Sequence, residues 1–129
     1  MKHARSLFLS AALGVAAVAS AHHSFAMFDL EKEVTLQGTV KEFRWANPHV
    51  WLEIVVTDDH GGATAWNFEM GATGMLARTG WKSRSLAPGD KVLVVANPLK
   101  TGESRGRLVR VTLPDGRVMG PGGLPPRPK

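Results

Sequence analysis

The sequence predicts an all-β domain with one short helix, folded as a five-stranded OB-like small β-barrel. Apolar and polar residues alternate in several short segments, which is the period of a strand with one buried face. These segments follow the order of three strands, a short helix and two strands, which matches a five-stranded OB barrel with its helix between strands three and four. A small β-sandwich is the alternative architecture.

The first expected strand begins at Glu33 and extends to about Trp45. Up to Val40 its apolar residues fall at even-numbered positions. After Val40 they fall at odd-numbered positions, Phe43 and Trp45. A change of phase inside one long strand indicates a bulge or a sharp coil, and Gly38 permits bending there. Such coiling is expected of the first strand of a small barrel.

The next two strands are expected to form a hairpin around a loop at residues 58–62. The second strand runs from Val50 to Val56, and the third runs roughly from Thr64 to Met70. Because the hydrophobic faces of a hairpin must pair, the inward face of the second strand lies beside an inward face that includes Trp66. The opposite face then carries both His49 and Glu69, with their Cβ atoms about 5–8 Å apart.

The second half of the chain is expected to hold a short helix and two more strands. The helix covers Thr73 to Thr79, with Met75 and Leu76 on its apolar side and Gly80 as its stop. A turn at residues 86–90 leads into a strand over 91–96. A loop at 97–103 precedes the last strand, over 105–113, and a turn at 114–117 follows it.

The first 21 residues have the features of a secretory signal peptide. Lys2 and Arg5 supply the positive start, residues 7–19 form a short apolar run, and Ala19-Ser20-Ala21 is a small-residue cleavage pattern. We therefore expect export to the periplasm and cleavage after Ala21, with no membrane anchor left. The expected organisation is a signal peptide (1–21), an N-terminal arm (22–32), an OB-like barrel domain (33–119) and a disordered Pro/Gly-rich tail (120–129).

Composition excludes several classes of site. Cysteine is absent, so no disulfide, thiolate zinc site or cysteine nucleophile is possible. The formal net charge of +5 includes two basic residues of the leader. The remaining excess of basic residues is too small to favour a nucleic-acid binder, and export argues against one too. Ser24 has no acidic partner at a useful spacing, so the sequence does not favour a hydrolase.

Several motifs carry a resemblance to a known family. They are Ala-His-His-Ser-Phe-Ala-Met-Phe-Asp (21–29), Gly-Thr-Val (38–40), Trp-Ala-Asn-Pro-His (45–49), Gly-Trp (80–81), Leu-Ala-Pro-Gly-Asp (86–90) and Leu-Pro-Asp-Gly-Arg (113–117). The chain resembles in these motifs an uncharacterised family of small exported bacterial proteins, domain of unknown function 6152. The resemblance implies an exported protein of unassigned activity, and it assigns no catalytic residue.

The histidines suggest a metal site. After cleavage at Ala21, His22 offers a free α-amine and an imidazole, and such nitrogen-rich sets suit Cu(II). His23 and His49 can complete the ligand set. Glu69 is then either a further ligand or an acceptor that orients an imidazole. The ordinary alternatives are a frayed terminus for His23, a backbone hydrogen bond for His49 and a solvated carboxylate for Glu69.

Other functions stay open at this point. Cleavage one residue earlier would start the protein at Ala21, and this terminus can wrap Cu(II) by itself through its amine, two backbone nitrogens and the His23 imidazole. A non-metal OB-like module would bind a peptide, an oligosaccharide or a partner protein across a face carrying Trp45 and Trp51. A metal-dependent redox enzyme is a third possibility. Thioether ligands for Cu(I) are available, but Met70 and Met75 fall where a core is expected.

Overall fold

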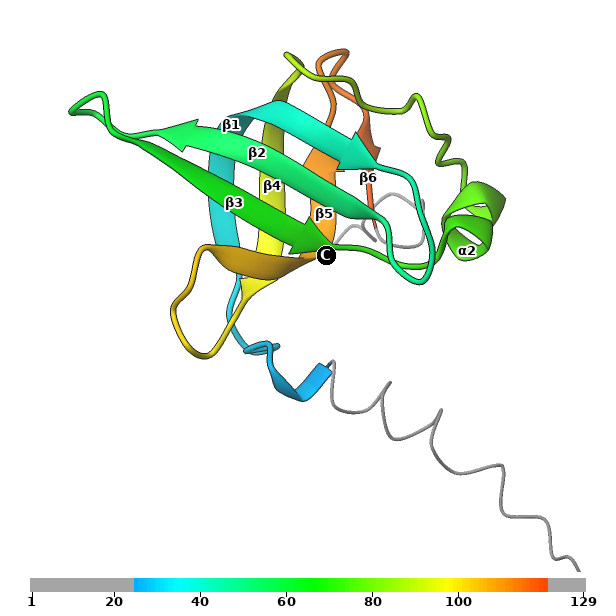
Figure 1. Cartoon of the computed structure of the whole chain (residues 1–129), viewed down its shortest axis with the longest axis horizontal. Coiled ribbons are helices and arrows are strands. Elements are labelled where there is room, and N and C mark those ends of the chain that lie inside the picture. The colour runs from blue at the N-terminus through cyan, green and yellow to red at the C-terminus, as the bar shows by residue number, and fades with distance from the viewer. Residues whose placement is uncertain (1–24, 121–129) are drawn as a thin grey trace, which may run out of the picture.

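Five strands curve into a closed barrel in the computed structural model, which describes residues 25–120 (Figure 1). Antiparallel neighbours follow the order β3-β2-β1-β4-β5, and a parallel pairing of β3 with β5 closes the ring. The strands are β1 (Val34–Arg44), β2 (Trp51–Thr57), β3 (Ala63–Glu69), β4 (Lys91–Pro98) and β5 (Arg105–Thr112). The predicted OB-like barrel is confirmed, and the sandwich alternative is wrong.

The long first strand joins the two halves of the barrel. Its first half pairs with β4 and its second half pairs with β2, with a bulge between Val40 and Glu42. Gly38 lies close to β2, since a Cβ atom at this position would come within 2.7 Å of the Val55 carbonyl oxygen. The predicted bulge is confirmed, and it lies just after the glycine that allows the close approach.

The inward faces of β2 and β3 supply the centre of the core. Leu52 and Ile54 of β2 are fully buried beside Phe68 of β3. Trp66 is on the same face but is only half-buried, because β3 pairs with β5 only from Asn67 onward and its first residues stand outside the ring. The predicted inward face of β3 is therefore correct, and Trp66 lies on it without being fully buried.

Two features of the strands differ from the sequence-based expectation. β4 continues through Asn97 to Pro98, which pairs with Gly106, because proline is tolerated at the end of a strand. A two-residue strand, β6 (Val118–Met119), pairs with the end of β5. Two residues are too short to show a period, so the sequence gives no signal for β6.

The short helix is α2 (Thr73–Arg78), and it lies at the end of the barrel beside the β1–β2 turn (Figure 1). Leu76 is its buried residue, whereas Met75 is 51% exposed. The expectation that Met75 belongs to the core is wrong, because a helix of six residues presents little more than one side chain inward. Among the described residues, no helix has the length and apolar character needed to cross a membrane.

The described part of the N-terminal arm is attached to the β4–β5 end of the barrel. Phe28 is only 2% exposed and forms an isolated bridge with Leu99. On either side of Phe28, the Asp29 amide donates to the Pro98 carbonyl (2.9 Å), and the Met27 carbonyl accepts from the Lys100 amide (3.0 Å). These contacts fix the direction in which the arm approaches the barrel.

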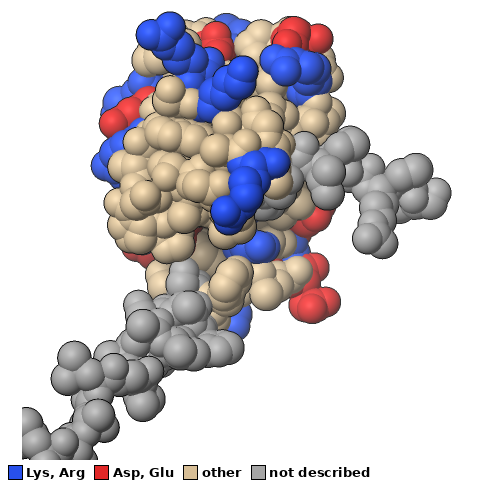
Figure 2. All heavy atoms as spheres, turned by 90° about the vertical axis from the view of Figure 1, so that its right-hand side faces the viewer, with Lys and Arg blue, Asp and Glu red and all other residues tan. Residues whose placement is uncertain are grey.

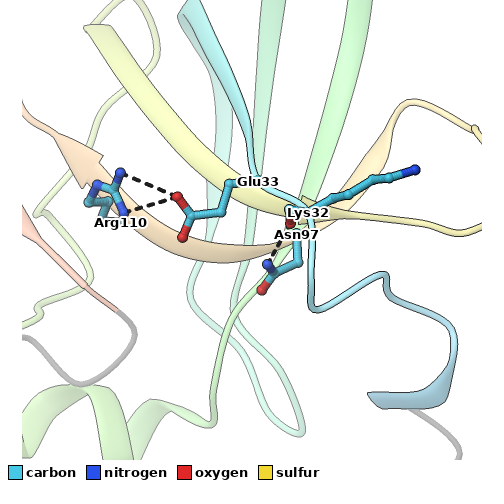
Figure 3. Close-up of polar contacts among 4 residues, drawn as sticks. All are labelled: Lys32, Glu33, Asn97 and Arg110. Carbon is cyan, nitrogen blue, oxygen red and sulfur yellow. Dashed lines mark hydrogen bonds and ion pairs between the residues drawn. The ribbon is translucent and has the colours of Figure 1, made fainter.

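A second set of contacts holds the arm where it joins β1 (Figure 3). The buried Asn97 side chain donates through Nδ2 to the Lys32 carbonyl oxygen at 2.8 Å. The Arg110 guanidinium lies 3.5 Å from a carboxylate oxygen of Glu33. The predicted disordered tail lies, apart from Gly120, outside the described residues, as does the predicted signal peptide.

Candidate functional site

His49 lies at the corner that leads into β2. The Asn47–Pro48 peptide bond is cis, and the Asn47 side-chain oxygen accepts from both the backbone N–H (3.0 Å) and the hydroxyl (2.9 Å) of Thr73. This pair of bonds ties the corner to the first residue of α2. After the corner, Val50 is fully buried and exchanges backbone hydrogen bonds with Met70 and Gly71. His49 is thus held between the Asn47–Thr73 contact on one side and the backbone bonds of Val50 on the other.

The His49 ring has one nitrogen bound to the protein. Its Nδ1 atom lies 3.0 Å from the Met70 carbonyl oxygen and 3.4 Å from a carboxylate oxygen of Glu69. A carbonyl oxygen can only accept, so Nδ1 carries the hydrogen and donates it. In the neutral ring Nε2 then bears the lone pair, and the His49 side chain is 42% exposed to solvent.

The sequence-based prediction that His49 and Glu69 share a face is confirmed by this contact. The Glu69 side chain is 12% exposed and sits between Trp51 on β2 and Arg107 on β5 in the strand register. Because the carboxylate faces Nδ1, it stands on the side of the ring that is already bonded to backbone. A carboxylate in this place can accept from Nδ1 and so help to orient the ring.

A pocket of about 330 Å³ lies beside this pair. Most of its wall is apolar, and the arm, the β2 corner, α2 and β5 all contribute to it. The lining residues are Phe25, Phe28, Pro48, His49, Glu69, Met70, Gly71, Ala72, Met75, Arg107 and Leu108. The pocket therefore brings the start of the described chain next to His49.

Phe25 and Arg107 form one side of the pocket together. The guanidinium carbon of Arg107 lies 5.1 Å from the centroid of the Phe25 ring, within the range of a cation–π contact. Phe28 and Leu108 are buried behind them, whereas Phe25 remains exposed. The pocket consequently combines an apolar surface with one basic side chain, Arg107, and one carboxylate, Glu69.

The four predicted metal ligands divide into two pairs. His49 and Glu69 are brought together at the pocket, whereas His22 and His23 lie outside the described residues. Within residues 25–120, no group of three His, Asp or Glu side chains is arranged so that it could hold a metal ion.

The two tryptophans of the proposed binding-module face have different surroundings. Trp45 packs against the core and lies 6.1 Å from Phe43 between ring centroids. Trp51 follows the outward alternation of β2, and the Arg105 guanidinium carbon lies 4.8 Å from its ring centroid. Trp45 therefore lies with the residues packed on the core, and Trp51 lies with the outward-facing residues of β2.

Sequence reasoning missed several residues that shape the pocket. Phe25 and Phe28 are spaced three apart in the arm, which is a weak sign of anchoring. Arg107 alternates with buried Gly106 and Leu108, so its outward direction was readable, but its aromatic partner was not. The bond from Asn47 to Thr73 joins residues 26 positions apart and leaves no local signal.

Comparison with known proteins places the chain in a family. Residues 11–108 match a family of unknown function (DUF6152), and the match spans most of the chain, including the arm, β1 to β4 and α2. No curated protein and no solved structure matches the chain significantly. The pocket and the His49 corner both lie within the matched residues or directly beside them. The protein belongs to the family of unknown function DUF6152.

Proposed function

We propose that this protein is exported to the periplasm and that its mature form binds one Cu(II) ion. The ligands are the α-amine and imidazole of His22, the imidazole of His23 and Nε2 of His49. Glu69 orients the His49 ring from the other side. The protein then works as a copper-binding module of the periplasm, as a carrier or a sensor of the metal.

The observation that supports this proposal is the shared pocket of Phe25 and His49. His22 and His23 precede Phe25 by three and two residues, and an extended chain spans at most about 3.3–3.6 Å per residue. Because Phe28 anchors the arm, the two histidines are tethered within about 7–11 Å of Phe25 along the chain. Such a tether gives them a high effective concentration at His49.

The state of the His49 ring also supports the proposal. Metal binding needs a neutral imidazole whose second nitrogen is fixed by a backbone carbonyl or a carboxylate. The Met70 carbonyl and Glu69 provide both kinds of acceptor on the Nδ1 side. A set made only of nitrogen donors suits Cu(II) better than Mg²⁺ or Ca²⁺, which prefer oxygen.

The test is a calorimetric titration with Cu(II) of protein isolated from the periplasm. N-terminal sequencing of the preparation comes first and should begin at His22. The His49→Ala variant should bind Cu(II) at least tenfold more weakly than the wild type, because one ring ligand is lost. His60→Ala is the matched control, since His60 is exposed in the β2–β3 loop and does not line the pocket.

Two outcomes would contradict the proposal. A protein that starts at Ala21 and binds Cu(II) equally well with and without His49 would show that the terminus wraps the metal alone. The absence of saturable one-to-one binding would remove the metal site altogether. The pocket would then be the place to test the alternative, a module that binds a peptide, an oligosaccharide or a partner protein.

A further inference from the structure

Met75 is placed unusually for a methionine in a small barrel. It lies on α2, is half exposed and lines the same pocket as His49. Its thioether rests on Gly71: a Cβ atom built there would lie 3.3 Å from Cε and 3.6 Å from Sδ of Met75. Gly71 directly follows Met70, whose carbonyl holds the His49 ring. A sulfur donor and an imidazole therefore flank the same short backbone segment.

We infer that this pocket also holds monovalent copper, with Nε2 of His49 and Sδ of Met75 as ligands. The inference deepens the proposed function and rests on it, because His49 serves both oxidation states. Cu(II) takes the terminal nitrogen ligands in addition to His49, whereas Cu(I) takes the thioether of Met75 in their place. The module would then accept copper in either state at one place.

The donor types favour Cu(I) in this position. Thioether sulfur is a soft ligand that selects Cu(I) over harder divalent ions, and imidazole suits copper in general. The sequence between Glu69 and Asp90 contains no Asp or Glu, and the carboxylate that lines the pocket, that of Glu69, lies on the Nδ1 side of the His49 ring. Figure 2 shows this side of the molecule as a largely uncharged surface, with Lys and Arg side chains on it and Asp and Glu side chains towards its edges.

The pocket wall also favours the lower charge. Removing an ion from water costs more as its charge rises, and Phe28 and Leu108 form an apolar, buried part of the wall. The two charged side chains that line the pocket, Arg107 and Glu69, have opposite signs, so their charges oppose each other. The preference for Cu(I) therefore comes from the apolar part of the wall.

The Met75 side chain has the freedom that this role requires. Methionine is unbranched and rotates about three side-chain bonds, so its sulfur can adjust to a ligand without moving the backbone. Half of the Met75 side chain is already in solvent, so a change of rotamer leaves little buried contact behind. Met70, which directly follows the end of β3, is in contrast buried in the core.

The experiment measures Cu(I) affinity by competition with a chromogenic Cu(I) chelator, without oxygen and with ascorbate present. Met75→Leu should weaken Cu(I) binding at least tenfold and leave Cu(II) affinity within twofold of the wild type. Met27→Leu is the matched control, because Met27 is similarly exposed but does not line the pocket. X-ray absorption of the Cu(I)-loaded wild type should show a copper–sulfur distance that Met75→Leu abolishes.

The outcomes separate this inference from the proposed function. Wild-type Cu(I) affinity in Met75→Leu, an equal loss in Met27→Leu, or no copper–sulfur distance in the wild type would overturn the inference. The Cu(II) dependence on His49 could still hold in each of these cases. Met75-dependent Cu(I) binding without any Cu(II) binding would instead support the inference and contradict the terminal Cu(II) site.

Discussion

Two tryptophans at different places in the barrel should contribute differently to the free energy of unfolding. Trp81 is fully buried, and its Nε1 donates to the Gly120 carbonyl at 2.9 Å. Trp66 stacks on Phe68 but remains half-buried at the open part of β3. Trp81→Ala should therefore lower the free energy of unfolding by about 3–5 kcal/mol, because it leaves a large cavity.

Trp66→Ala should cost less, about 1–2 kcal/mol, because only part of its apolar surface is removed from water. Urea unfolding of both variants, with the slope checked for constancy, gives the comparison. Equal losses would mean that Trp66 is as deeply packed as Trp81 and that the outer half of β3 is covered. The sequence alone suggests full burial of Trp66, because alternation reveals the face of a residue but not its depth.

At the residue scale, the sequence predicted the pairing of His49 with Glu69 but not the state of the imidazole. Parity along two strands of a hairpin is enough to place both side chains on one face. The Met70 carbonyl that fixes Nδ1 belongs to a backbone position after the end of β3, and no pattern of side chains reports where a carbonyl points. The tautomer could therefore come only from the structure.

At the scale of a strand, Gly38 allows β1 to approach β2 closely. A Cβ atom on Gly38 would lie 2.7 Å from the Val55 carbonyl oxygen and 2.9 Å from Cδ1 of Ile54. Backbone oxygen cannot yield as a flexible side chain can, so Gly38→Ala should destabilise the protein by about 1–3 kcal/mol. A Gly38→Ala protein as stable as the wild type would show that β1 and β2 can separate without loss.

Gly74 provides the matched control in α2. Apart from its chain neighbours and the backbone of its own helix, no atom lies within 4 Å of a Cβ atom placed there, and its φ angle is not positive. Gly74→Ala should raise the free energy of unfolding by about 0.5–1 kcal/mol, since alanine loses less conformational freedom in a helix. Thermal or urea unfolding of the two variants should therefore show shifts of opposite sign.

At the element scale, the alternation of apolar and polar residues predicted the strand bounds well where a strand is long enough to show it. β1, β2, β3 and β5 begin and end within about two residues of expectation, within the usual uncertainty of boundaries. β4 was expected to stop before Asn97, since Asn-Pro is a common loop signal. The structure extends it because Asn97 and Pro98 find partners on β5, and such a partner is not visible locally.

At the scale of the whole molecule, the barrel was predictable and the attachment of the arm was not. The order of strands and helix follows from local alternation, and one known topology fits that order. The arm is held by Phe28 and by bonds to residues about 70 positions away, such as Pro98 and Lys100. Contacts of this kind leave no period in the sequence, so neither the pocket nor its Phe25 wall could be derived.

The attachment of the arm leads to a prediction that links folding to copper binding. Phe28→Ala should lower the free energy of unfolding by about 3–5 kcal/mol. It should also loosen the arm, so that the Asp29 amide, which donates to the Pro98 carbonyl, exchanges its hydrogen faster. No copper ligand is altered, yet Cu(II) affinity should fall at least tenfold in the folded variant, because the effective concentration of the terminal histidines at His49 falls.

Leu30→Ala is the control on the same arm, because Leu30 is exposed and its loss should change neither exchange nor affinity. Hydrogen exchange followed by mass spectrometry and copper titration on the same preparations give both quantities. Faster exchange of the Asp29 amide with unchanged Cu(II) affinity would mean that the terminus binds copper without the barrel. If Cu(II) affinity falls in Phe28→Ala but not in Leu30→Ala, tight Cu(II) binding depends on the attachment of the arm to the barrel. A terminus that wraps the metal alone would not need this attachment.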